Sequence, residues 1–158
     1  MRSDVPELII ASELEAPAAA LWAHATSMEG VNDELMPFVR MHVPREARGK
    51  GIADAPLGVV AFHSWLLAFG LVPFDRHALT LVSIDAGHGF SERSWSWLQR
   101  SWRHDRSIEP SPRGAIVTDR VGFDPRLSLA TPIVTRIVAG IFRHRHHRLQ
   151  RRFGGSFV

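Results

Sequence analysis

The sequence predicts an α+β fold in which a curved antiparallel sheet of six to seven strands wraps around one long C-terminal helix. Runs of alternating apolar and polar residues follow one another from residue 59 to residue 123, as expected for neighbouring antiparallel strands. An apolar stripe with helical spacing then begins at residue 131, and such a stripe needs a sheet to cover it. With 158 residues and an ordinary apolar share, we expect a single domain over residues 1–158.

The first part of the chain predicts one strand and two short helices. Alternation places Leu8, Ile10 and Leu14 on one face of a strand. Proline suits the first turn of a helix, serine suits the N-cap, and a later proline ends a helix. We therefore expect a strand over 5–14, a helix opened by Pro17, and a second helix over 28–35 that is capped by Ser27 and ended by Pro37.

The middle of the chain alternates strands with one long loop. The segment from Pro44 to Pro56 is rich in glycine, proline and charge, so we interpret it as a mobile loop and a candidate lid. The remaining segments are apolar runs bounded by turn residues. The expected strands cover 38–43, 59–69, 74–85, a strand that begins at Phe90, 102–109 and 114–123.

The inner face of the last strands carries charged residues. Alternation points Trp102, His104, Arg106 and Ile108 inward from one strand, and Ala115, Val117, Asp119, Val121 and Phe123 inward from the next. If Glu109 pairs with Gly114, His104 lies opposite Asp119; if Ser94 pairs with His104, Glu92 lies opposite Arg106. If Asp85 pairs with Phe90, the inward residues of the strand over 74–85 are His77, Leu79, Leu81 and Ser83, whereas Val82 and Ile84 face outward.

Burying a charge costs several kcal/mol even when the charge is paired, so the inward position of these four ionisable side chains requires an explanation. Two interpretations remain open. The set is either a structural ion-pair network beneath a helix or the wall of a water-containing cavity in which these groups meet a ligand.

The C-terminal segment predicts a helix of about six turns. Thr131 is the expected N-cap, Pro132 the first helical residue, and Gly154 with Gly155 the end. The apolar stripe comprises Ile133, Val134, Ile137, Val138, Ile141 and Phe142. We expect Ile137 and Ile141 to be buried against the sheet, and Arg145 to lie on the stripe between Phe142 and Leu149.

Composition excludes several kinds of site. The chain has no cysteine, so it has neither disulfides nor thiolate metal ligands, and the absence of a signal peptide or an apolar run of ~18 residues predicts a cytoplasmic protein. The net charge is +3, with the basic excess between Arg143 and Arg152. This segment lacks interleaved aromatic residues, which argues against binding of nucleic acid. Its contact with a membrane surface through Arg143, Arg148 and Arg151 is a minority interpretation.

The histidines of the same segment are His144, His146 and His147. We interpret them as a solvated helix face, and we predict no metal and no cofactor.

Particular residues resemble the START-like (SRPBCC) superfamily, whose fold is called the helix-grip. They are the small-residue helix from Ala16 to Trp22, the string Trp102, His104, Arg106, the later Thr118-Asp119 with Pro125, and Ile141-Phe142 with Arg145 and Leu149. The resemblance implies a carrier or sensor of hydrophobic ligands, since most members are of that kind. Some members are polyketide cyclases, aromatases or dehydratases, and the superfamily has no shared catalytic set.

These observations lead to a hypothesis and an alternative. The hypothesis is a non-enzymatic domain that binds a hydrophobic small molecule or lipid between sheet and helix. The expected ligand-binding residues are Glu92, Trp102, His104, Arg106, Val117, Asp119, Val121 and Ile141. The alternative is a cyclase- or dehydratase-type enzyme in which His104 is the general acid or base, Asp119 orients it, and Arg106 stabilises enolate charge.

Overall fold

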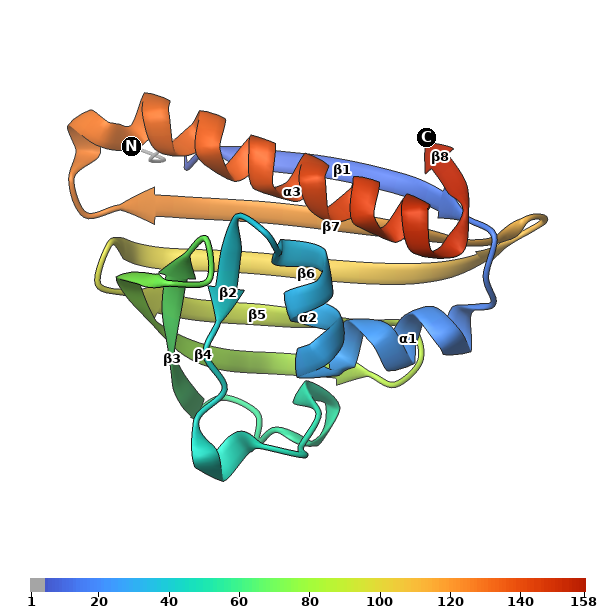
Figure 1. Cartoon of the computed structure of the whole chain (residues 1–158), viewed down its shortest axis with the longest axis horizontal. Coiled ribbons are helices and arrows are strands. Elements are labelled where there is room, and N and C mark those ends of the chain that lie inside the picture. The colour runs from blue at the N-terminus through green and yellow to red at the C-terminus, as the bar shows by residue number, and fades with distance from the viewer. Residues whose placement is uncertain (1–4) are drawn as a thin grey trace.

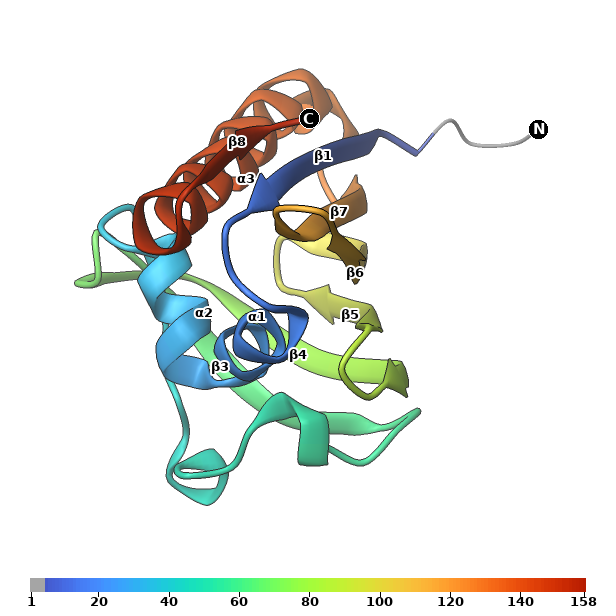
Figure 2. The same ribbon diagram turned by 90° about the vertical axis from the view of Figure 1, so that its right-hand side faces the viewer.

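The computed structural model describes residues 5–158, which form one curved antiparallel sheet with helices on its concave face (Figures 1 and 2). The elements are β1 (Glu7–Leu14), α1 (Ala18–Thr26), α2 (Met28–Leu35), β2 (Val39–Met41), η1 (Arg45–Ala47), η2 (Ile52–Asp54), β3 (Val60–Ala68), β4 (Val72–Asp85), β5 (Gly89–Ser96), β6 (Gln99–Ser111), β7 (Gly114–Pro125), η3 (Ser128–Ala130), α3 (Thr131–Phe153) and β8 (Gly155–Phe157). The predicted fold class and order of elements are thereby confirmed.

The sheet has eight strands in the order β2-β3-β4-β5-β6-β7-β1-β8. Figure 2 shows it curling around the three helices, with α3 running along the β1 and β7 side and α1 and α2 closing the opposite side. The strand count exceeds six to seven because the three residues after α3 turn back and pair with β1 as β8. Within residues 5–158, no helix is long and apolar enough to span a bilayer.

The helix ends follow the local sequence signals with one correction. The Ser27 hydroxyl oxygen accepts the backbone N–H of Gly30 at 3.0 Å, which makes Ser27 the N-cap of α2 as predicted. Thr131 was expected at the N-cap of α3, but that position belongs to Ala130, because the turn η3 leads directly into the helix. Gly154, with a φ of 76°, ends α3 in a conformation that favours glycine.

The two central hairpins are longer than predicted, so their registers differ by two residues from the expected ones. Ser111 pairs with Gly114 across a two-residue turn, which places Arg106 opposite Asp119 and His104 opposite Val121. In the preceding pair, Glu92 lies opposite His104 rather than opposite Arg106. Side chains alternate between faces with a period of two, so a shift of two leaves the inward set unchanged. The predicted faces are therefore right and the predicted cross-strand pairs wrong, although the side chains of His104 and Asp119 still meet, at 2.7 Å.

The strand β4 contains an irregularity that the alternation did not indicate. A shift in pairing between Leu81 and Ser83 places Ile84 opposite Phe90, so Ile84 packs in the core and Ser83 is exposed. The expectation for these two residues was wrong. His77, Leu79 and Leu81 are buried on the inner face as predicted, and Val82 is exposed.

The buried residues of the helix α3 begin at Val138. Val138, Phe142, Arg145 and Leu149 are buried, which confirms Arg145 on the inward side. Ile137 is 53% exposed and Ile141 is only partly buried, so the expected burial of Ile137 against the sheet is wrong. The reason is that Val134, Ile137 and Ile141 face a space between the helix and the sheet.

Candidate functional site

A cavity of about 320 Å³ lies on the concave face, between the sheet, α2 and the first half of α3. Its volume is at the lower end of the range for small-molecule sites. Most of its wall is apolar. The apolar lining comes from helices (Ala25, Met28, Val31, Leu35, Val134, Ile137, Val138, Ile141, Phe142), from strands and their ends (Val39, Met41, Leu66, Phe74, Leu79, Leu81, Phe90, Leu98, Trp102) and from Ile52 of η2.

A smaller part of the wall is polar and comes from strands β4, β5 and β6 and from α3. The polar lining residues are Asp75, His77, Glu92, Ser96, Gln99, His104 and Arg145. Gln99 is distinctive, since its Oε1 atom is buried and accepts no hydrogen bond from any residue in 5–158. The cavity therefore combines a broad apolar surface with one polar wall.

Behind the polar wall, Asp119 is the most highly coordinated carboxylate of the site. It is fully buried, and each of its oxygens accepts two hydrogen bonds. Oδ1 accepts His104 Nε2 and Arg106 Nε, both at 2.7 Å, and Oδ2 accepts Arg106 Nη2 at 2.7 Å and His146 Nε2 at 3.0 Å. Burial alone would raise the pKa of Asp119, but Arg106 and His104 hold that pKa well below its usual range. Asp119 therefore has no lone pair left to accept a further hydrogen bond.

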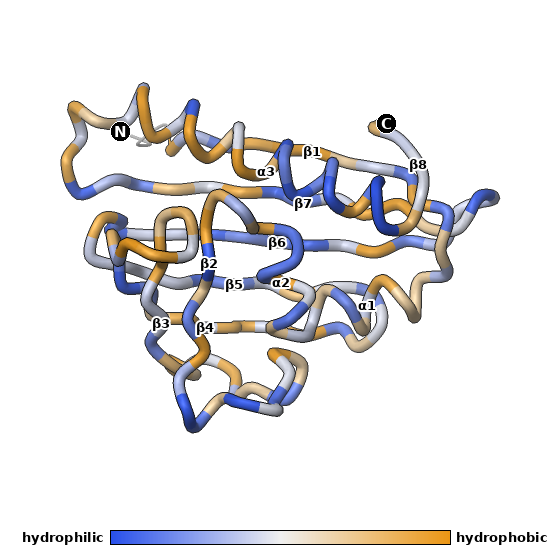
Figure 3. The backbone as a smooth tube through the Cα atoms, viewed as in Figure 1, coloured by the Kyte–Doolittle hydropathy of each residue, from blue (hydrophilic) through white to orange (hydrophobic). Residues whose placement is uncertain are grey.

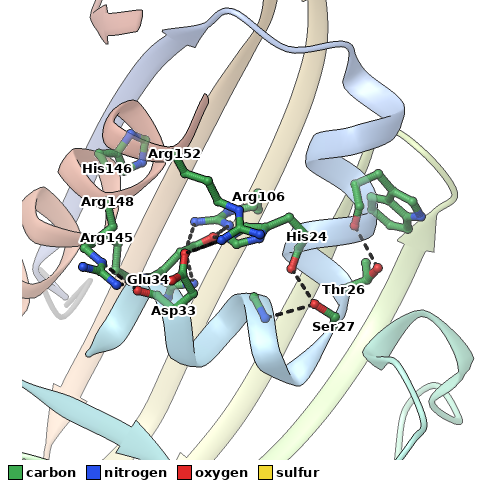
Figure 4. Close-up of polar contacts among 12 residues, drawn as sticks. His24, Thr26, Ser27, Asp33, Glu34, Arg106, Arg145, His146, Arg148 and Arg152 are labelled. Atoms are coloured by element: carbon green, nitrogen blue, oxygen red, sulfur yellow. Dashed lines mark hydrogen bonds and ion pairs between the residues drawn. The ribbon is translucent and has the colours of Figure 1, made fainter. Parts of the chain in front are cut away.

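The helix α2 supplies a second buried carboxylate, Glu34, which joins two arginines (Figure 4). Arg106 donates to it through Nη1 at 2.7 Å and through Nη2 at 3.0 Å, while Arg145 donates through Nε at 2.8 Å and lies 2.7 Å away through Nη2. Burial opposes ionisation of Glu34, yet the two guanidinium groups lower its pKa to about 2. Glu34 therefore ties α2 to the sheet and to α3.

His104 connects this network to the cavity wall. Its Nε2 faces Asp119 at 2.7 Å, and its Nδ1 faces Glu92 Oε2 at 3.7 Å, so each ring nitrogen has a carboxylate as its neighbour. Burial disfavours the imidazolium, but the carboxylates of Asp119 and Glu92 outweigh it and raise the pKa of His104. A protonated His104 balances the charges, because three carboxylates then meet two guanidinium groups and one imidazolium.

Of the three carboxylates in this network, Glu92 is the one that lines the cavity. Its Oε1 lies 2.6 Å from His77 Nε2 and accepts the Ser94 hydroxyl at 2.7 Å. Burial would raise the pKa of Glu92, but hydrogen bonds from His104 and His77 hold it far below the usual value. Glu92 is therefore an anion whose lone pairs are largely occupied.

His146 extends the network to β1 and is the clearest departure from expectation in α3. It is fully buried, its Nδ1 lies 2.8 Å from the Ser12 hydroxyl, and the same hydroxyl oxygen accepts Gln150 Nε2 at 2.9 Å. The interpretation of His144, His146 and His147 as a solvated face is wrong for His146. Its spacing of four from Phe142 placed it on the inward side of the helix, a signal that the surrounding arginines obscured.

The predicted ligand-binding residues divide into two groups. Glu92, Trp102, His104 and Ile141 line the cavity, whereas Arg106, Val117, Asp119 and Val121 do not belong to its lining. Arg106 and Asp119 lie behind His104, and Val117 and Val121 pack in apolar clusters beneath the helix. The two interpretations of the polar set therefore both apply, because the structure contains an ion-pair network and, directly in front of it, a cavity.

Sequence reasoning missed Glu34, His77 and Arg145 as members of this polar site. Glu34 is three residues from Val31 on the inward face of α2, so helical spacing was the available signal. No group of three or more potential metal-binding side chains is arranged to hold an ion within the described part of the chain. His24 lies nearby with its Nε2 unpartnered, 3.9 Å from Glu34 Oε1, and burial lowers its pKa (Figure 4).

Comparison with known proteins gives a family and a fold. A model described as "Domain of unknown function (DUF8410)" matches residues 12–153, and no curated protein matches the sequence. Protein CV1439 from Chromobacterium violaceum superposes with a TM-score of 0.71 at 12% identity, covering 95% of this chain and 99% of the other. A START superfamily protein from Mycobacterium smegmatis superposes with a TM-score of 0.66 at 11% identity, covering 93% and 96%.

A third similar structure is DynU16, a protein from the dynemicin biosynthetic locus. It has a TM-score of 0.55 and 12% identity, and the match covers 94% of this chain and 46% of that one. At such identities the likeness is one of fold. The resemblance to the START-like (SRPBCC) superfamily is confirmed at this level, and the fold is the helix-grip.

Proposed function

Because the chain belongs to the DUF8410 family, which is defined without an activity, we propose a function from the geometry itself: the protein binds a largely apolar small molecule in its cavity and releases it unchanged. The observation that carries this proposal is the composition of the wall, in which an apolar surface from sheet and helices surrounds a few polar groups. Small-molecule sites commonly have this composition.

The polar wall supports a ligand with one polar end. Arg145 has N–H groups that Glu34 does not occupy, and the unpartnered Oε1 of Gln99 offers an acceptor, whereas the hydrogen bonds of His104 and Glu92 are already made within the wall. Asp119 and Glu34 hold His104 and Arg145 in fixed orientations, as second-layer hydrogen bonds do in other sites. Arg106 and Asp119 then support the site without touching the ligand.

The same hydrogen bonds argue against the enzymatic alternative. A general base needs a free lone pair and a pKa near the working pH. His104 has a carboxylate beside each ring nitrogen and a raised pKa, and Asp119 already accepts four hydrogen bonds. A cyclase or dehydratase mechanism would have to break this network at each turnover.

Filling the cavity should weaken binding. Val134→Trp places a large ring where the α3 wall lines the cavity, and if a ligand then overpacks the remaining space by about 1–3 kcal/mol, its affinity falls about 5- to 150-fold. The measurement is titration with N-phenyl-1-naphthylamine, a neutral apolar dye that fluoresces on leaving water. The matched control is Ile133→Trp, because Ile133 is the neighbouring residue, is 61% exposed and does not line the cavity. Equal dye affinity in the two variants would contradict the proposal.

Replacing His104 separates binding from catalysis. His104→Gln retains a donor toward Asp119 but removes the proton carrier of the enzymatic alternative. Native mass spectrometry should detect the same co-purified molecule, at the same mass, in the wild type and in the variant. A compound heavier by one water in the variant alone would instead support a dehydratase.

A further inference from the structure

Three segments that are distant in the sequence meet at one end of the sheet. They are residues 67–74 at the β3–β4 turn, residues 95–100 at the β5–β6 turn, and residues 126–137 from η3 into α3. Register brings them together, since Ala68 pairs with Val72, His77 with Ser96, and Gln99 with Pro125. In Figure 1 these turns lie at the left, where α3 begins. We call this surface the apolar end.

The apolar end exposes an unusual number of large apolar side chains. Leu129 is 90% exposed and Leu71 is 81% exposed, each at the tip of its own turn. The other exposed members are Phe69, Val72, Phe74, Trp97, Leu98, Leu127, Ile133 and Ile137. Figure 3 shows the hydrophobic colour of the β3–β4 turn and of the first turns of α3. Large apolar side chains gathered in the exposed turns at one end of a domain indicate an interaction site.

The backbone of the β3–β4 turn adds a second observation. Phe69 and Gly70 have φ values of 53° and 73°, and the Leu71 N–H donates to the Ala68 carbonyl at 3.0 Å, which is the geometry of a two-residue hairpin turn. This turn holds Phe69 at the tip of the hairpin, where it is 68% exposed.

The apolar end is continuous with the cavity. Phe74, Leu98 and Ile137 belong both to the exposed set and to the cavity lining. These residues therefore form the rim of the cavity mouth, so whatever covers the apolar end also covers the route by which an apolar ligand enters and leaves.

The apolar end carries an excess of positive charge. Residues 67–74, 95–100 and 126–137 contain no aspartate or glutamate, and they carry Arg100, Arg126 and Arg136. Arg100 pairs with Asp124 at 3.4 Å, so the charge is compensated there, whereas Arg126 and Arg136 are exposed and form no ion pair within residues 5–158. Leucine and phenylalanine tips, a tryptophan and flanking arginines form the pattern by which proteins bind at the surface of an anionic bilayer.

We propose that the apolar end docks on the surface of an anionic lipid bilayer, with Leu71 and Leu129 inserted among the acyl chains and Arg126 and Arg136 at the headgroups. Two tips that protrude from separate turns suit a fluid surface better than a flat complementary protein face. In the docked position the mouth of the cavity faces the membrane, because the rim residues belong to the apolar end. This inference concerns a surface and not the cavity, so it stands or falls separately from the proposed function.

The test is co-sedimentation with vesicles of phosphatidylcholine alone and of phosphatidylcholine mixed with phosphatidylglycerol. The wild type should bind the anionic vesicles, and added salt should weaken binding because it screens the arginines. Leu71→Asp combined with Leu129→Asp should lower binding at least about tenfold, since two inserted leucines are lost. Both residues are exposed, so the variant should fold, and it should retain dye binding in the cavity.

Two control variants complete the design. Val82→Asp changes an exposed apolar residue of β4 that lies away from the apolar end, and it should bind vesicles as the wild type does. Charge reversal at Arg143 and Arg151 tests the basic segment of α3 and should also leave binding intact. The proposal is overturned if neither kind of vesicle binds, if only the charge reversal abolishes binding, or if the leucine double variant instead disrupts a dimer measured by light scattering.

Discussion

Replacing Asp119 by alanine is expected to lower the free energy of unfolding by about 3–5 kcal/mol, the typical cost of removing one partner of a buried ion pair. The side chain is fully buried and accepts hydrogen bonds from His104, Arg106 and His146. Its removal deprives Arg106 and His104 of a carboxylate that each of them bonds, in an interior that water does not reach. Urea unfolding at neutral pH measures the change.

A surface pair provides the control for this measurement. Asp105 lies on the opposite face of β6 and bonds Arg93 at 2.7 Å, with both side chains more than one third exposed. Exposed pairs contribute about 0–1 kcal/mol, so Asp105→Ala should have a small effect. Similar losses of unfolding free energy for the two variants would mean that water reaches Asp119. The burial of Asp119 would then not be the source of its contribution to stability.

The second large effect is expected on acidification. The folded state lowers the pKa values of Glu34, Glu92 and Asp119, so each contributes stability that is present above its unfolded value near ~4 and is lost as the pH falls toward its folded value. For Glu34, whose pKa falls from 4.5 to about 2, the contribution is about 3 kcal/mol. Chemical unfolding between pH ~5 and ~2 should show a loss of several kcal/mol in total.

The variant Glu34→Gln serves as the control for the acid limb. It should start less stable and should lose less on acidification, because one of the three carboxylates no longer titrates. An identical slope in the variant and the wild type would contradict the assignment of Glu34 to the network.

Near neutral pH, the free energy of unfolding depends on His104 and His24, and their contributions change in opposite directions as the pH rises. The raised pKa of His104 adds stability that is complete below ~6.5 and fades as the pH rises through the folded value. The lowered pKa of His24 costs stability as the pH falls below ~6.5, because the unfolded chain binds the proton first. The variant His24→Gln isolates the His104 contribution, and its stability should decrease steadily above pH ~6.5.

Which side chains face the interior of the sheet follows from the alternation of residues along each strand. Alternation with a period of two placed Glu92, His104, Arg106 and Asp119 inward, and a register error of two residues did not change this result. The α+β class, the two short helices and the long final helix also follow from local signals, because caps, prolines and helical spacing act over a few residues. These features need no knowledge of what packs against them.

The contact between His104 and Asp119 was predictable from neighbouring strands, but the contacts that Glu34 makes were not. Glu34 reaches Arg106 across 72 positions of sequence and Arg145 across 111, and no local pattern encodes such pairings. The shift within β4 that turns Ile84 inward, the burial of His146 against Ser12, and the cavity beside Ile137 likewise depend on how α2 and α3 settle on the curved sheet. The physical reason is that a side chain's face is a property of its own strand or helix, whereas its partner depends on the packing of separate elements, which burial of the whole core selects.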